Sequence, residues 1–169
     1  AGFDQGTVAD YMFLIQLGML VGVLGCGVLA DRMRKRGIGS ERLFIVGVAI
    51  AIILQLALVV MPNAAPGVFW TSHAVVASAM ILSFAILTER FPAEITGRVI
   101  TTINLMGFIC AFIFQWGIGA IIGTFAIKPD GGYMPEAHST ALAAMLALQF
   151  VAFLTYFLFR EPVKSSVGE

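Results

Sequence analysis

Charged residues are scarce in this chain of 169 residues, and neither sign is in excess. Ten Lys and Arg stand against ten Asp and Glu, so charged residues make up 12% of the chain and the formal net charge is zero. A soluble domain carries about 25% charged residues. This deficit argues against a water-soluble globular enzyme and against a disordered chain. The zero net charge also argues against a nucleic-acid partner, which a basic surface would bind.

Cysteine and histidine are equally rare, and their scarcity limits redox and metal chemistry. The chain has two cysteines, Cys26 and Cys110, both within apolar runs, and two histidines, His73 and His138. They provide no disulfide framework and no zinc cluster. A phosphate-binding loop of the Walker type is also missing. We therefore expect no enzymatic activity, no bound metal and no cofactor.

Apolar residues, in contrast, make up 59% of the chain. A helix that crosses a bilayer needs about 20 of them in succession. Five stretches approach or exceed this length without any Asp, Glu, Lys or Arg, which predicts an all-α integral membrane protein. The predicted spans are residues 11–30, 43–61, 68–88, 99–127 and 141–159. The fourth is longer than one span requires, so we expect it to be tilted or to end in the interface.

The basic residues gather on one side of the predicted spans. Nine of the ten lie in the links after the first and third spans or in the C-terminal tail, and only Lys128 lies on the other side. Because basic residues favour cytoplasmic links, we expect an external N-terminus, a cytoplasmic C-terminus and a location in the inner membrane. An odd number of spans without a visible signal peptide predicts that residues 1–169 are a single incomplete bundle, the C-terminal part of a larger protein.

The link after the first predicted span contains a compact charged motif. It reads Gly27-Val-Leu-Ala-Asp31-Arg32-Met-Arg34-Lys35-Arg36. The positive-inside rule alone can explain Arg34, Lys35 and Arg42. Acidic residues contribute little to topology, so Asp31 needs another explanation. A carboxylate here can interact with the positive N-terminal end of a neighbouring helix.

A second motif, Thr88-Glu89-Arg90-Phe91-Pro92-Ala93-Glu94-Ile95-Thr96-Gly97-Arg98, ends the third predicted span. The first motif resembles the Gly-x-x-x-Asp-Arg-x-Gly-Arg-Arg loop of the major facilitator superfamily, although Arg34 replaces the usual second glycine. The second resembles the acidic, Phe-Pro, Gly-Arg link of the same transporters. Their order and spacing extend the resemblance over the whole chain, as helices eight to twelve of a twelve-helix transporter of bacterial type.

The resemblance implies most of the C-terminal six-helix half of a major facilitator fold. It implies secondary active transport of a small solute by alternating access, driven by an ion or substrate gradient, most plausibly of protons. The implied partners are the N-terminal half of the same transporter, the lipid bilayer and a small-molecule or ion substrate. The implied cytoplasmic gate consists of Gly27, Asp31, Arg32, Arg36, Glu89 and Arg98.

Two other functions stay open at this point. The chain could be a self-assembling helical membrane protein without transport activity of its own, because glycine-rich helix faces also permit homodimers. It could also be a membrane-embedded enzyme or redox subunit, but that function requires clustered titratable groups. Only one histidine, His73, lies inside a predicted span.

Glycines at helical spacing predict close packing of the first and fourth spans. Small residues four apart let two helix backbones approach each other. The second span has a single glycine, Gly47, and the fifth has none, so we expect these two helices to be peripheral and to face lipid. The predicted packing glycines are Gly18, Gly22 and Gly25 in the first span and Gly119 and Gly123 in the fourth.

Polar residues inside the spans are the candidates for contacts with a transported solute, because desolvating an unpartnered polar group is costly. Asn104 and Gln115 are eleven residues apart and therefore share one face of the fourth span. Each candidate could instead form a hydrogen bond between helices, and Trp70 could be an interfacial anchor. The candidates are Gln115, Asn104, His73, Gln16, Trp70 and Trp116.

Overall fold

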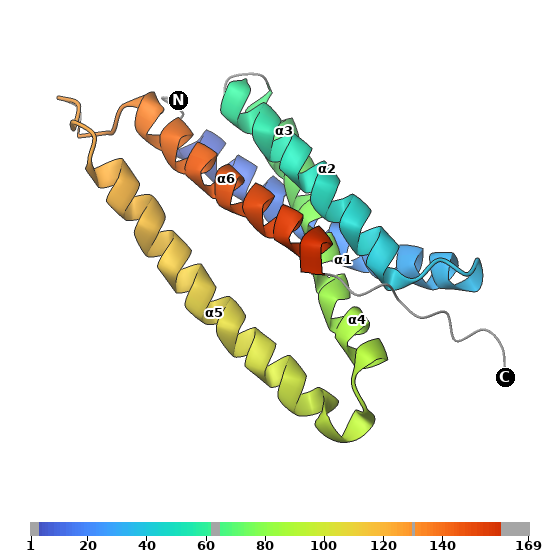
Figure 1. The fold of residues 1–169 in the computed structure, drawn as a ribbon. Helices are drawn as coiled ribbons and strands as arrows, with labels where there is room; N and C mark the ends of the chain where they lie inside the picture. The colour runs from blue at the N-terminus through green and yellow to red at the C-terminus, as the bar shows by residue number, and fades with distance from the viewer. Residues whose placement is uncertain (1–3, 62–64, 130, 160–169) are drawn as a thin grey trace, which may run out of the picture.

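The computed structural model describes residues 4–61, 65–129 and 131–159. Its elements, in chain order, are α1 (Gln5–Lys35), α2 (Ser40–Val60), α3 (Pro66–Ala77), the 3₁₀ segment η1 (Ser78–Ile81), α4 (Leu82–Arg90), α5 (Ala93–Gly123) and α6 (Pro135–Phe159) (Figure 1). Elements α3, η1 and α4 together form one span. Over the described ranges, five helices are therefore long and apolar enough to cross a membrane, as the sequence predicts.

The helices extend beyond most of the predicted spans, but α5 ends before its predicted limit. Residues 124–127 lie outside the helix, because the chain turns after Gly123. Ile127 then forms an isolated antiparallel bridge with Tyr133, and Gly131 adopts a φ of 82°. The apolar run continues through this turn, so hydrophobicity alone could not locate the end of α5.

Helices α1 and α3 pack closely along the glycine face of α1. A Cβ atom at Gly18 would lie 2.9 Å from Thr71 Cγ2, and one at Gly22 would overlap Ser78 Oγ and the Val75 carbonyl oxygen. Both glycines are buried. A Cβ at Gly25 would meet no atom within 4 Å, so in the described chain the contact is confined to the first two glycines.

Helix α2 packs on the bundle with one face and leaves an apolar stripe of Val46, Ile50, Ile53, Leu56 and Val60 exposed on the other. It packs against α3, α4 and α6, and its buried residues include Gly47 and Gln55. A Cβ at Gly47 would lie 2.5 Å from Ala79 Cβ, and Gln55 Nε2 donates to the Leu142 carbonyl oxygen at 3.5 Å. The single glycine of α2 therefore brings it close to η1, while its exposed stripe leaves the expected lipid-facing position a prediction.

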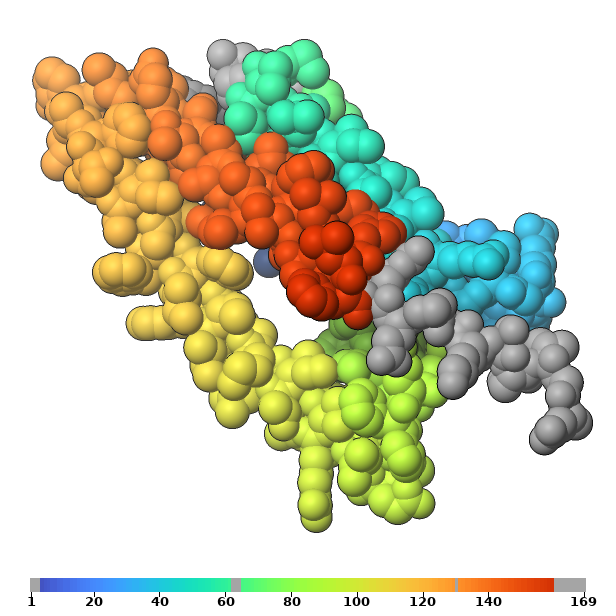
Figure 2. All heavy atoms as spheres, in the orientation of Figure 1, coloured from blue at the N-terminus to red at the C-terminus, as the bar shows by residue number. Residues whose placement is uncertain are grey.

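Helix α5 is the least packed of the five spans. None of its residues is buried, and it packs against α6 and the end of α4. Figure 2 shows an open gap between the middle of α5 and α6. Neither Gly119 nor Gly123 has an atom within 4 Å of the position that a Cβ would take. The second predicted glycine face therefore has no partner among the described residues, and its packing role stays a prediction.

An aspartate caps the first turn of α1. Asp4 Oδ1 accepts a hydrogen bond from the Thr7 backbone N–H at 2.9 Å, and Asp4 Oδ2 accepts one from Thr7 Oγ1 at 2.7 Å. These bonds, the backbone one first, favour the ionised carboxyl and lower the pKa of Asp4 below its ordinary value.

We predict that this cap contributes its full stabilisation at neutral pH. Because the folded state lowers the pKa of Asp4, the contribution is lost only as the pH falls from the ordinary aspartate range through the lowered value. The Thr7 amide resonance, followed by NMR during an acid titration in detergent micelles, should therefore shift below the ordinary aspartate range. In the control variant Asp4→Asn this transition should disappear, and a midpoint above the ordinary range would contradict the prediction.

Candidate functional site

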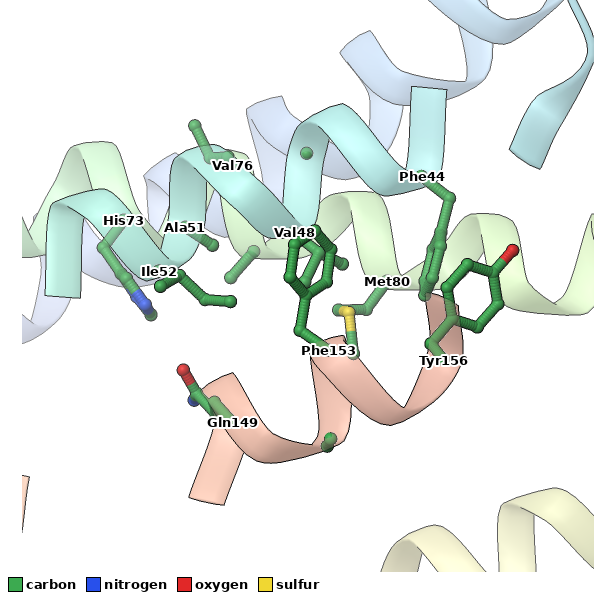
Figure 3. A pocket seen from close by; sticks show the side chains of 13 residues that line it. Phe44, Val48, Ala51, Ile52, His73, Val76, Met80, Gln149, Phe153 and Tyr156 are labelled. Atoms are coloured by element: carbon green, nitrogen blue, oxygen red, sulfur yellow. The ribbon is translucent and has the colours of Figure 1, made fainter. Parts of the chain in front are cut away.

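A pocket of about 340 Å³ lies between α2, α3, η1 and α6. Its walls are largely apolar, and three polar side chains interrupt them: His73 of α3 and Gln149 and Tyr156 of α6 (Figure 3). The lining residues are Phe44, Gly47, Val48, Ala51, Ile52, His73, Val76, Ala77, Met80, Gln149, Ala152, Phe153 and Tyr156.

Two polar side chains from different helices meet at one end of the pocket. Figure 3 shows the imidazole of His73 and the amide of Gln149 pointing toward each other. The ring of Trp70 packs edge-to-face on His73, with 6.3 Å between the ring centroids. The hydrogen bonds found among the described residues involve neither the His73 nor the Gln149 side chain, so both can bond to a bound molecule.

The opposite end of the pocket is tied to the charged residues of α2. The Tyr156 hydroxyl donates a hydrogen bond to Glu41 Oε1. The ring of Tyr156 also packs against Phe44, with ring centroids 6.3 Å apart. The position of the Tyr156 ring therefore depends on Glu41, which lies in the first turn of α2.

Two ion pairs join α1, α2 and α4 where the basic links begin, a region that we call the charged end. Arg90 Nη2 lies 3.1 Å from Glu41 Oε2, and Arg34 Nη2 lies 3.0 Å from Glu89 Oε1. Ser40 Oγ also donates to Glu89 Oε1 at 3.2 Å. Each of the two glutamates therefore accepts hydrogen bonds from two side chains: Glu89 from Arg34 and Ser40, and Glu41 from Arg90 and Tyr156.

Only part of the predicted gate takes part in these contacts. Glu89 does, and its partner is Arg34, the residue that departs from the family loop. A Cβ at Gly27 would meet no atom within 4 Å. Among the described residues no ion pair or hydrogen bond is found for the side chains of the other predicted gate residues, which are Asp31, Arg32, Arg36 and Arg98.

The structure brings only some of the predicted solute contacts together. His73 lines the pocket, and Trp70 packs on it. The side chains of Gln16, on α1, and of Asn104, Gln115 and Trp116, on α5, are exposed and lie outside the pocket.

The sequence analysis did not select Gln149, Tyr156 or the buried Gln55. A signal for the two glutamines was present, because each is an amide within an apolar span, as Gln115 is. Both glutamines lie in the second and fifth spans, which contain little or no glycine and were expected to face lipid.

Metal ligands are not clustered in the described ranges, where no group of three or more His, Cys, Asp or Glu could hold an ion. No protein family, curated protein or solved structure matches this chain. The resemblance to the major facilitator superfamily therefore depends on the two charged motifs and on the order of the helices between them.

Proposed function

We propose that this chain is part of a secondary transporter that moves a small solute by alternating access, and that it supplies five helices of the C-terminal half. The observation that carries this proposal is the contact between the two sequence motifs. Arg34 of the first motif and Glu89 of the second pair at 3.0 Å across 55 positions of sequence. Transporters and other switching proteins form such ion pairs in one conformation and break them in another.

In this proposal the charged end faces the cytoplasm, and the protein lies in the inner membrane. The ion pairs then hold α1, α2 and α4 together within the half. Asp31, Arg32, Arg36 and Arg98 remain available for contacts with the N-terminal half of the same transporter. The gate would therefore have two parts. The ion pairs act within this half, and Asp31, Arg32, Arg36 and Arg98 contact the N-terminal half.

The exposure of α5 supports the same proposal. Asn104 and Gln115 are exposed on a helix that has no buried residue, and an amide side chain that faces hydrocarbon is costly. We propose that this amide face lines the solute cavity and that further helices of the polypeptide complete it. Gly119 and Gly123 would then allow one of those helices to approach α5 closely.

Transport by reconstituted protein tests this proposal. An antibody to residues 164–169 should isolate from native membranes a polypeptide clearly larger than the 18.1 kDa of this chain. We expect that polypeptide, in proteoliposomes on a solid-supported membrane, to give currents with one member of a panel of sugars, organic anions, nitrate and drugs. Residues 1–169 alone should give none. A native band of 18.1 kDa that cross-links to a dimer and gives no current would favour self-assembly instead.

The substitution Gln115→Ala tests the proposed solute contact. It should raise the apparent KM for the solute about five- to tenfold, the effect of one lost hydrogen bond, and should change kcat much less. Ile113→Ala is the matched control, because two residues along α5 correspond to a rotation of about 200°. If both substitutions raise the apparent KM equally, Gln115 has a packing role and does not contact the solute.

A further inference from the structure

The pocket between α2, α3 and α6 is separate from the amide face of α5, and the transport proposal makes no use of it. Its volume is about 340 Å³, near the lower limit for small-molecule sites. The pocket is therefore suited to one small molecule rather than to a large lipid.

The polar end of the pocket can hold a group that accepts two hydrogen bonds from different directions. A neutral imidazole has one donor and one acceptor nitrogen, and an amide has a donor NH₂ and an acceptor oxygen. His73 and Gln149 face each other from α3 and α6 (Figure 3). A carboxyl group has two oxygens and can use one for each side chain, whereas an alcohol would have to bond both through a single oxygen.

The remainder of the pocket is elongated and apolar. Gln149 and Tyr156 lie seven residues apart on α6, which corresponds to about 10 Å along the helix. Met80 and Phe153 line the space between these two ends (Figure 3). A straight alkyl chain matches this shape, and burying it removes apolar surface from water.

We propose that this pocket binds a medium-chain carboxylic acid, with its carboxyl between His73 and Gln149 and its alkyl chain directed toward Tyr156. The proposal depends only on the pocket and holds whether or not the chain transports a solute. Its failure would therefore leave the transport proposal intact.

Tryptophan fluorescence provides a direct test, because Trp70 packs on His73 and the only other tryptophan, Trp116, is 70% exposed on α5. The variant Trp116→Phe, in phosphatidylcholine nanodiscs, leaves Trp70 as the reporter. We expect 2-bromodecanoic acid to quench Trp70 saturably, and unlabelled decanoic acid to reverse the quenching. The isomer 10-bromodecanoic acid should quench less, because its bromine lies at the Tyr156 end.

Two variants of α6 separate binding in the pocket from partition into the lipid. Ala152→Phe places a ring in the pocket, and Ala143→Phe, nine residues away and about 180° around the helix, places the same ring outside it. We expect Ala152→Phe to weaken the apparent affinity at least about tenfold, and Ala143→Phe to leave it unchanged. Gln149→Leu, which keeps the bulk of the side chain, should weaken it about tenfold through lost hydrogen bonding.

Three results would overturn the proposal. The first is quenching that rises linearly with acid concentration and is equal for Trp70 and for Trp116 in the variant Trp70→Phe, which indicates partition into lipid alone. The second is an equal affinity for the Ala152→Phe and Ala143→Phe variants. The third is displacement by decanol as effective as displacement by decanoic acid, which would show that the site does not recognise the carboxyl group.

Discussion

Replacing Gly22 by alanine is expected to destabilise the bundle by about 1–3 kcal/mol, the usual cost of forcing an extra carbon into a packed interior. The added Cβ would overlap Ser78 Oγ and the Val75 carbonyl oxygen, and it would lie 2.9 Å from Val75 Cα. The hydroxyl of Ser78 can rotate away, but the two backbone atoms of Val75 cannot. Helices α1 and α3 must therefore move apart, and the stability lost is that of the packing between them.

The matched control is Gly25→Ala, one turn further along α1. A Cβ at this position meets no atom within 4 Å, so alanine should leave the stability unchanged or raise it by up to about 1 kcal/mol through helix propensity. Reversible unfolding in mixed micelles measures both variants on the same scale. If the two substitutions cost the same, the contact between α1 and α3 does not hold the bundle together.

Replacing Glu41 by alanine is expected to destabilise the charged end by about 1.5–3 kcal/mol, the range for hydrogen bonds to a charged group. The Glu41 side chain is only 16% exposed, and it accepts hydrogen bonds from Arg90 and from Tyr156. Its removal therefore breaks the ion pair that links α2 to α4 and the hydrogen bond that links α2 to Tyr156 of α6. The ring of Tyr156 then keeps its contact with Phe44 but loses the hydrogen bond of its hydroxyl group.

Arg34→Ala should cost much less, about 0–1 kcal/mol, although its ion pair is as short. The side chains of Arg34 and Glu89 are 59% and 46% exposed, so water and salt screen their attraction. Unfolding at low and high ionic strength distinguishes the two sites, since added salt should remove the effect of Arg34→Ala and spare most of that of Glu41→Ala. A larger loss for Arg34→Ala at both salt concentrations would contradict this ranking.

The sequence predicted the helices well, because a long apolar run without charge has few alternatives to a membrane span. It predicted the close packing of the glycine face of α1 in part, since Gly18 and Gly22 pack against α3 and Gly25 meets no atom within 4 Å. Glycine spacing indicates that another helix can pack closely on a face, but it does not indicate which helix does so. For the same reason the glycines of α5 have no partner among the described residues, and the one glycine of α2, Gly47, still forms a close contact with Ala79.

The candidate site was less predictable, because a pocket belongs to no single segment. His73 was selected for being the only histidine in a span, and the pocket contains it. Gln149 could not be matched to His73 without knowledge that α6 packs beside α2 and faces α3 across the pocket. Arg34 was assigned to topology because a basic residue in a link needs no further explanation, and only the three-dimensional structure shows its partner, Glu89 of α4.

The unequal lengths of the helices have a consequence for the surrounding lipid. Helices α1 and α5 have 31 residues each and α2 has 21, which gives lengths of about 46 Å and 31 Å. The hydrocarbon core is about 30 Å thick, so α2 spans it upright while α1 and α5 tilt or project beyond it. The perimeter of the bundle therefore has no uniform hydrophobic height. Acyl chains that match the membrane beside α2 are too short beside α5, so a change in lipid chain length acts on one side of this protein before the other.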